Sequence, residues 1–180
     1  MADQELTQLA RDVDARCRLR GEFVLRSGQM ASEYLDKYLF EADPLLLGRV
    51  AARMARLLPT DTQLLGGLEL GGVPLATALS QLTGLPALFV RKQAKAYGTR
   101  KLAEGDDPAG KRVTLVEDVI TVGGTVVAAA DALRALGATV PAVVCAIDRS
   151  SPGESAVAAA GITVLSVLTK DQLDSVAGQR

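Results

Sequence analysis

Residues 113–127, VTLVEDVITVGGTVV, combine the residue types that could hold a phosphorylated sugar. An apolar run is followed by two adjacent carboxylates, Glu117 and Asp118, and then by a turn rich in threonine and glycine at residues 121–125. Backbone N–H groups and hydroxyls of such a turn can bind a phosphate at the start of a helix, where the helix dipole favours negative charge. The carboxylates would repel a phosphate directly beside them, but they could accept hydrogen bonds from sugar hydroxyls. The pattern predicts a sugar-phosphate site, with a simple helix cap and an acidic first turn as the alternative.

Residues 91–101, RKQAKAYGTRK, form a strongly basic segment. They hold five lysine or arginine side chains and no acidic one. A solvated charged face is the usual origin of such a run, but its single sign and its place after an expected strand favour binding of an anion. Gly98 and Gly105 bracket its mobile portion, and we expect residues 93–105 to close over the site as a lid that excludes water.

Two further segments carry weaker signals. Residues 67–76, GLELGGVPLA, form a second glycine-rich turn between an expected strand and helix. Its backbone amides could serve a second anionic group, although any close-packed turn also uses glycine. Arg149 follows Asp148 at the end of another expected strand. Its guanidinium could pair with that aspartate at the surface or clamp a ligand carboxylate, and the sequence leaves both possibilities open.

The composition excludes several classes of protein. The 180 residues contain no histidine, which removes histidine-based proton transfer and every histidine-ligated metal site. Lysine and arginine total 20 against 21 aspartate and glutamate residues, so no overall basic field exists to bind duplex nucleic acid or an anionic membrane. Cys17 and Cys145 are far apart in sequence and are expected to be buried and reduced. The polar N-terminal segment and the lack of a long apolar run predict a soluble cytoplasmic protein.

The order of apolar and polar stretches predicts an α/β protein with one domain over residues 1–180. Apolar strands alternate with amphipathic helices, which is typical of a parallel sheet covered by helices on both faces. The expected strands of the sheet are residues 64–66, 87–90, 113–116, 142–147 and 163–168. The expected helices are residues 1–20, 45–58, 74–83, 126–136 and 154–160.

The N-terminal part and one central segment differ from this alternation. Strand signals at residues 23–25 and 34–40 predict a small antiparallel addition, so that residues 1–42 precede a core of residues 43–180. Residues 91–112 are expected to lack regular structure.

Ligands of parallel sheets bind beyond the carboxyl ends of the strands, so the groups that follow the strands should meet at one edge. These groups are residues 69–72, 91–101, 117–125 and 148–149. We therefore expect one pocket that holds a ribose with charged groups at both ends.

These pieces, in this order, resemble the type I phosphoribosyltransferases over nearly the whole chain. The stretch VEDVITVGGT is similar to the phosphoribosyl-diphosphate motif of that superfamily, and FVLRSGQMASEYLD with VRKQAKAYG points to its orotate branch. The resemblance implies a Rossmann-like parallel-sheet fold with a small N-terminal hood. It also implies transfer of the phosphoribosyl group from 5-phosphoribosyl 1-diphosphate to orotate. That reaction gives orotidine 5′-monophosphate and diphosphate in the de novo synthesis of UMP.

The resemblance also implies roles for individual residues. Glu117 and Asp118 would hold the ribose hydroxyls, with the 5′-phosphate on the turn that follows. Arg149 would bind the carboxylate of orotate. Lys95 would be catalytic together with the acidic pair, because it would stabilise charge on the departing diphosphate. The residues expected to contact substrates are Arg26, Arg91, Lys92, Lys95, Tyr97, Glu117, Asp118, Val119, Ile120, Thr121, Val122, Gly123, Gly124, Thr125 and Arg149.

A magnesium ion and a homodimer are implied as well. The sequence shows no carboxylate cage for a metal, so Mg²⁺ would bind through the diphosphate and hydroxyls of the substrate and not directly to the protein. In the family, part of the basic loop reaches into the neighbouring subunit, which implies a shared active site. Three residues depart from the family pattern: Tyr97 replaces a frequent histidine, and Gly71 and Arg26 each replace a frequent lysine. Arginine at 26 keeps the charge, whereas glycine at 71 loses it.

Two other functions share parts of this pattern. A purine-salvage phosphoribosyltransferase would keep the sugar-phosphate motif but would have no carboxylate partner for Arg149. A non-catalytic regulator that senses the sugar diphosphate would keep the fold and bind RNA or a promoter. The intact basic loop and the lack of an added DNA-binding segment weigh against the regulator.

Overall fold

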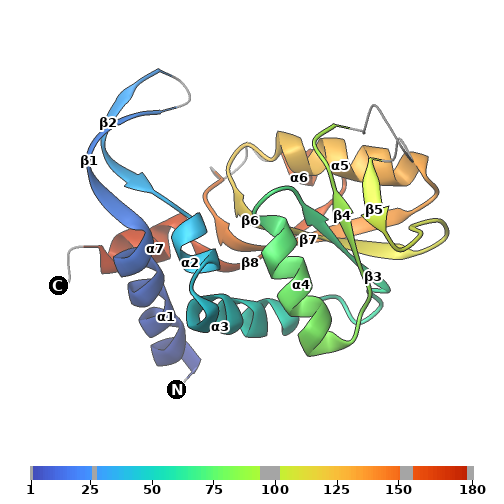
Figure 1. The fold of residues 1–180 in the computed structure, drawn as a ribbon, viewed down its shortest axis with the longest axis horizontal. Helices are drawn as coiled ribbons and strands as arrows, with labels where there is room; N and C mark the ends of the chain where they lie inside the picture. Colours follow the sequence, from blue (N-terminus) through green and yellow to red (C-terminus); the bar gives the residue numbers. More distant parts are fainter. Residues whose placement is uncertain (1, 26–27, 94–101, 151–155, 178–180) are drawn as a thin grey trace.

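The computed structural model describes residues 2–25, 28–93, 102–150 and 156–177, and it alternates strands and helices after an N-terminal helix and hairpin (Figure 1). The helices are α1 (Ala2–Cys17), α2 (Tyr38–Glu41), α3 (Pro44–Ala55), α4 (Gly72–Thr83), α5 (Gly124–Ala135), α6 (Ala156–Ala159) and α7 (Lys170–Val176). The strands are β1 (Arg18–Val24), β2 (Met30–Leu35), β3 (Leu64–Leu68), β4 (Ala87–Val90), β5 (Ala103–Gly105), β6 (Arg112–Ile120), β7 (Thr139–Asp148) and β8 (Thr163–Thr169). None of the described helices is long and apolar enough to cross a membrane.

Six strands form the central sheet in the order β5-β4-β3-β6-β7-β8. Strands β4, β3, β6, β7 and β8 pair in parallel, whereas β5 pairs antiparallel with β4 at the edge. Every residue of β3 is buried, as expected for a strand covered on both faces. The predicted parallel sheet is confirmed, and the carboxyl ends of its parallel strands lie along one edge.

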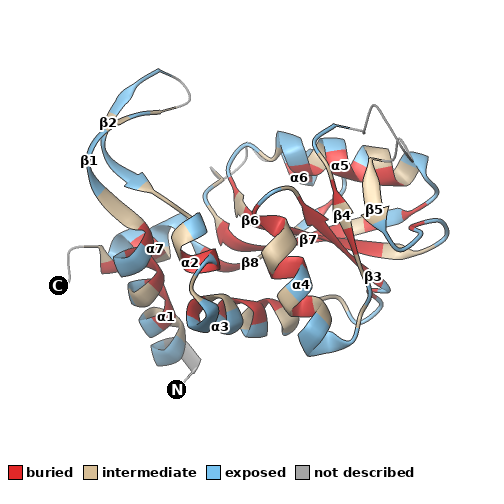
Figure 2. Cartoon of the chain, viewed as in Figure 1, coloured by how far each residue is buried: buried red, intermediate tan, exposed pale blue. Residues whose placement is uncertain are grey.

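Helices cover both faces of this sheet, as predicted. On one face, α1, α3, α4 and α7 pack in a hydrophobic cluster that includes the fully buried Phe40 and Met54. On the other face, α5 and α6 pack in a second cluster that includes Leu133 and Val157. Figure 2 shows the buried residues concentrated in the sheet and on the helix sides that face it.

Glycine lets α4 lie directly on the sheet. A Cβ atom on Gly67 would lie 2.7 Å from the Cβ of Ala76 and 2.8 Å from the carbonyl oxygen of Gly72. A Cβ atom on Gly72 would overlap the carbonyl oxygen of Val116. Close packing therefore accounts for two of the glycines in the 67–76 turn.

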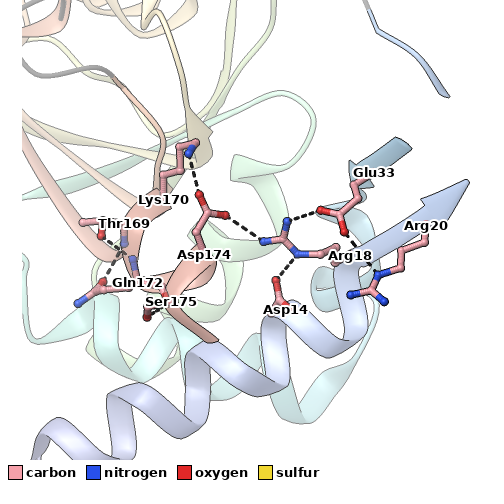
Figure 3. Close-up of polar contacts among 9 residues, drawn as sticks. All are labelled: Asp14, Arg18, Arg20, Glu33, Thr169, Lys170, Gln172, Asp174 and Ser175. Atoms are coloured by element: carbon pink, nitrogen blue, oxygen red, sulfur yellow. Dashed lines mark hydrogen bonds and ion pairs between the residues drawn. The ribbon is translucent and has the colours of Figure 1, made fainter. Parts of the chain in front are cut away.

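β1 and β2 form a separate antiparallel hairpin that extends away from the central sheet (Figure 1). Its base is held by Arg18, whose guanidinium pairs with carboxylates from three elements (Figure 3). These are Asp14 of α1 at 2.6 Å, Glu33 of β2 at 2.9 Å and Asp174 of α7 at 3.2 Å. Because Arg18 is mostly buried while bonding all three, it fixes where the hairpin leaves the body of the protein.

The structure corrects the expected strand at residues 34–40. β2 ends at Leu35, and the residues Tyr38–Glu41 form the short helix α2. An apolar run of this length is compatible with either element, and packing decides between them. Here α2 carries the fully buried Phe40 into the core.

β6 is longer than the expected strand at residues 113–116. It pairs with β7 as far as Ile120 and Asp148, so Glu117 and Asp118 lie within the strand instead of following it. Charged residues normally mark the end of a buried strand, but both of these side chains are buried. The sequence therefore placed the end of this strand too early.

Two short elements are absent from the sequence expectations. β5 lies within residues 91–112, which were expected to lack regular structure, and it pairs with β4. α7 begins at a capping box in which Thr169 and Gln172 bond each other's backbone N–H groups (Figure 3). Both are too short to produce a clear periodic signal.

Candidate active site

The groups expected at the carboxyl edge of the sheet meet there. Gly71, in the turn after β3, lies against the side chain of Asp118 on β6. The backbone N–H of Glu69 donates to the carbonyl of Val90 at the end of β4, over 2.9 Å. The backbone N–H of Arg149, after β7, donates to the carbonyl of Ile120 over 2.8 Å. The topology thus brings the turn after β3, the end of β4, the carboxylates of β6 and Arg149 to one edge, whereas most of the expected group 91–101 lies outside the described residues.

A cavity of about 310 Å³ opens between the ends of β3 and β4 and the start of α5. It is lined by two basic side chains, by part of the turn at residues 121–125 and by the start of the turn after β3. The residues that line it are Leu68, Glu69, Val90, Arg91, Lys92, Leu102, Gly124, Thr125, Ala128 and Ala129.

The turn at residues 121–125 has the geometry of an anion site. Gly123 has φ +81°, and a Cβ atom there would overlap Cγ2 of Val157, so both backbone and packing require glycine. Gly124 and Thr125 begin the 12-residue helix α5 and are exposed. No side chain caps this helix and its first turn holds no acidic residue, so the alternative of a simple acidic cap is wrong. The N–H groups of the turn are available to an anion.

The carboxylates of β6 lie in a buried cluster with two residues from α2 and its N-cap. Asp118 has no exposed surface and Glu117 is 8% exposed. Lys37 Nζ lies 2.6 Å from Asp118 Oδ2, and the buried carboxyl of Glu41 lies close by. The backbone N–H of Val119 donates to Asp118 Oδ1 over 2.5 Å. The acidic pair is therefore not an open pair of carboxylates but part of a four-residue cluster.

Burial and proximity keep two of these carboxyls protonated near neutral pH. Desolvation, followed by the charge of Asp118 and a hydrogen bond to it, raises the pKa of Glu41 to about 8. Desolvation and a hydrogen bond to Asp118 raise the pKa of Glu117 to about 9. Burial lowers the pKa of Lys37, but bonding to Asp118 outweighs that effect and raises it overall. At neutral pH the cluster is one ion pair with two neutral carboxyls.

Lys37 and Glu41 are not among the site residues expected from the sequence. They are four residues apart, which places them on one side of a single helical turn around the apolar residues 38–40. That spacing was available in the sequence. Interpreting residues 34–40 as a strand hid it.

The predicted diphosphate residues are only partly described. Arg91 and Lys92 line the cavity, and Arg91 Nε donates to the carbonyl oxygen of Gln93 over 3.4 Å. Lys95, Tyr97 and Arg26 lie outside the described residues.

The other residues predicted to contact substrates, in and near the turn at residues 121–125, differ in how exposed they are. Ile120 is buried in the core and its carbonyl already bonds Arg149, so its side chain is structural. Val119 is half-buried, whereas Thr121 and Val122 are exposed. The Arg149 guanidinium is exposed, and among the described residues it forms no ion pair. Asp148 instead accepts hydrogen bonds from the backbone N–H and hydroxyl of Ser150, so the surface ion pair is not formed.

The described residues contain no group of three or more His, Cys, Asp or Glu side chains arranged to hold a metal ion. In the acidic cluster, Lys37 already occupies one oxygen of Asp118. Cys17 and Cys145 are both free and buried, as predicted.

Comparison with known proteins gives a consistent result. Residues 47–164 match the family model of the phosphoribosyl transferase domain. The chain is 67% identical over 167 residues to an orotate phosphoribosyltransferase of Nocardioides sp. (strain ATCC BAA-499 / JS614), an alignment that covers 93% of both chains.

Solved structures show the same similarity. The fold resembles that of Mycobacterium tuberculosis H37Rv orotate phosphoribosyltransferase in complex with inorganic phosphate. For that pair the TM-score is 0.83 at 30% identity, covering 95% of this chain and 99% of the other. For the same mycobacterial enzyme with 5-phospho-alpha-D-ribosyl 1-diphosphate, the TM-score is 0.79 at 29% identity, covering 94% and 99%.

Proposed function

This chain belongs to the orotate phosphoribosyltransferases, and on that basis we propose which of its residues carry out the reaction. The enzyme transfers the phosphoribosyl group of 5-phosphoribosyl 1-diphosphate to orotate, giving orotidine 5′-monophosphate and diphosphate in pyrimidine biosynthesis. The relationship decides against the purine-salvage and non-catalytic alternatives. One observation supports the roles that we assign to individual residues. The turn at residues 121–125, the acidic cluster and the basic side chains all lie at one edge of the sheet.

The 5′-phosphate lies on residues 121–125 in this proposal. The exposed Thr125 offers a hydroxyl and the start of α5 offers backbone N–H groups. The mycobacterial relative was solved with inorganic phosphate and with the sugar diphosphate, which supports a phosphate site in this fold.

Glu117 is the member of the acidic pair that we assign to the ribose hydroxyls. It retains 8% exposure, whereas Asp118 has none. Displacement at the anomeric carbon passes through a state in which the sugar ring is cationic, as in glycoside cleavage. A carboxyl next to the hydroxyls orients the sugar for that displacement through hydrogen bonds, which a neutral carboxyl can both donate and accept.

Arg91, Lys92 and Lys95 are proposed to stabilise the departing diphosphate. Arg91 and Lys92 line the cavity beside the phosphate-binding turn, which supports their role. Mg²⁺, when bound through the diphosphate and hydroxyls of the substrate, would neutralise further charge on the leaving group. Residues 103–105 of the expected lid are held in β5 by pairing with β4, so closure would involve the residues between Lys92 and β5, most of which lie outside the described residues. Such closure would exclude water that otherwise hydrolyses the activated sugar.

Orotate is proposed to bind at Arg149, whose exposed guanidinium can hold a carboxylate through two hydrogen bonds. Residues 1–42 form the hood of a single domain, and Arg26 and Tyr97 would complete the substrate contacts. The projecting β1–β2 hairpin supports a homodimer with a shared active site, because an isolated two-stranded hairpin is marginally stable in water. We place the reaction in the cytoplasm.

The direct test follows orotate consumption by the purified protein. We expect consumption only when Mg²⁺ and 5-phosphoribosyl 1-diphosphate are both present, with orotidine 5′-monophosphate as the product. Adenine in place of orotate should give no nucleotide. Turnover of adenine, or none of orotate under these conditions, would contradict the assignment.

A further inference from the structure

The ion pair between Lys37 and Asp118 joins a partly exposed side chain to a buried one. Lys37 Nζ lies 2.6 Å from Asp118 Oδ2. The side chain of Lys37 is 33% exposed, whereas that of Asp118 is completely buried. An ammonium group has three N–H donors, so the bond to Asp118 leaves Lys37 able to bind a second group. The partly exposed side chain of Lys37 is therefore open to a second partner, whereas Asp118 is covered.

The ammonium lies where an anion would be stabilised by the backbone as well. Asp118 Oδ2 lies directly against Gly71, which is the N-cap of the 12-residue helix α4. No side chain caps that helix in the described structure. The partial positive charge of the α4 N-terminus and the charge of Lys37 thus act on the same region.

The other acidic groups of the cluster do not cancel this positive charge at neutral pH. Glu41 faces the cluster from α2 and Glu117 faces it from β6, and burial raises the pKa of both carboxyls. Asp36 lies at the edge of the cluster, where its carboxylate accepts the backbone N–H of Tyr38. Because Glu41 and Glu117 stay protonated, they can donate hydrogen bonds and do not repel an anion.

We propose that Lys37 is a further substrate-binding residue, which contacts the diphosphate of 5-phosphoribosyl 1-diphosphate and is held in position by Asp118. The inference deepens the function proposed above and rests on it. It gives the buried carboxylate of Asp118 a further role, which is to hold this cation in position.

The test measures binding of magnesium diphosphate and of ribose 5-phosphate by calorimetry. Lys37→Met should weaken magnesium diphosphate binding by about 10- to 100-fold, the loss of one charge-assisted hydrogen bond. It should leave ribose 5-phosphate binding within about twofold, because that ligand lacks the diphosphate. Lys37→Arg should recover most of the binding.

Lys111→Met is the matched control. Lys111 also lies 2.6 Å from a carboxylate, that of Asp106, and is also 33% exposed, but it precedes the opposite end of β6. This variant should bind magnesium diphosphate as the wild type does. Unchanged binding in Lys37→Met, or an equal loss in Lys111→Met, would overturn the proposal.

Lys37→Met leaves the buried carboxylate of Asp118 unpaired, so this variant could misfold. A second comparison separates misfolding from the loss of a ligand contact. The double variant Lys37→Met/Asp118→Asn removes both charges and is compared with Asp118→Asn alone. Weaker magnesium diphosphate binding in the double variant supports the proposal, and equal binding contradicts it. Orotate turnover by the wild type is measured separately, and its absence would contradict the proposed function without changing the diphosphate result.

Discussion

Gly71 lies in direct contact with the buried carboxylate of Asp118. A Cβ atom on residue 71 would overlap Oδ2 and Cγ of that aspartate and would lie 2.8 Å from Oε1 of Glu41. The position therefore has no room for a side chain, and the cation beside this turn comes from Lys37 on the N-terminal side of α2. The departure from the family pattern at residue 71 thus has a structural reason.

Gly71→Ala should lower turnover by about 10-fold or more, because the added methyl group displaces the Asp118 carboxylate and the lysine it holds. We also expect a loss of about 1–3 kcal/mol in the free energy of unfolding. Steady-state kinetics with varied sugar diphosphate and denaturant unfolding measure both effects. Gly48→Ala in α3, where a Cβ atom meets nothing within 4 Å, is the control and should be neutral or slightly stabilising. Full activity in Gly71→Ala would show that the carboxylate can move without consequence.

The stability of the ligand-free protein should fall as the pH rises from about 5 to 9. The pKa values of Glu41 and Glu117 rise from an ordinary 4.5 to about 8 and about 9 on folding. Between those values the folded state retains protons that the unfolded state has released, so each group lowers stability by up to about 1.4 kcal/mol per pH unit. Urea unfolding at a series of pH values measures the slope.

Glu41→Gln and Glu117→Gln provide the controls for that slope. Each should flatten it, because each removes one group whose pKa is raised by burial. The lowered pKa values of Asp106 and Asp174 act in the opposite direction, but their contribution is complete above the ordinary pKa range of aspartate. A free energy of unfolding that is constant or rising from pH 6 to 9 would rule out the protonated cluster.

Thr125→Val should weaken binding of ribose 5-phosphate by about 10-fold or more, because it removes a hydroxyl donor to a charged phosphate. Thr125 is exposed at the start of α5, so the change should leave the fold intact. Calorimetric titration gives the affinity. Thr77→Val on α4, where the hydroxyl bonds the carbonyl of Val73, serves as the matched control. Equal affinities for the two variants would place the phosphate elsewhere.

Arg149→Lys should raise KM for orotate by about 10-fold, because lysine cannot make the paired hydrogen bonds of a guanidinium to a carboxylate. KM for the sugar diphosphate should change little. Initial rates with each substrate varied in turn separate the two constants. Arg56→Lys, at an exposed arginine at the end of α3, is the control. A change confined to the sugar diphosphate would contradict the assignment of Arg149 to orotate.

Substituting aspartate for exposed apolar residues of the β1–β2 hairpin should weaken the proposed dimer. Val24 and Met30 are 71% and 63% exposed on paired positions of β1 and β2, and a second copy of the chain would cover them. Val24→Asp and Met30→Asp should raise the dimer dissociation constant and make activity depend on protein concentration, as sedimentation and dilution assays measure. Leu82→Asp, at an exposed leucine near the end of α4, should leave association unchanged. Unaltered sedimentation of the hairpin variants would remove this surface from the interface.

The sequence by itself determined the architecture and located the turn at residues 121–125, to which we assign the phosphate. Alternation of apolar strands with helices is a local signal with a strong period, and it predicts a parallel sheet with one ligand edge. The turn at Gly123 and Gly124 can also be predicted from local sequence. The left-handed backbone at Gly123 excludes most other residues. Arg149 directly follows the end of β7, as the strand pattern predicts.

Only the tertiary structure decided the chemistry of the acidic cluster. Lys37, Glu41 and Gly71 come from three places in the chain, and no local pattern states that they surround Asp118. Their protonation depends on burial, which is a property of the packed protein and not of the residue type. The sequence therefore established which residues could bind a phosphorylated sugar, whereas packing decided which of them remain charged and which can reach a ligand.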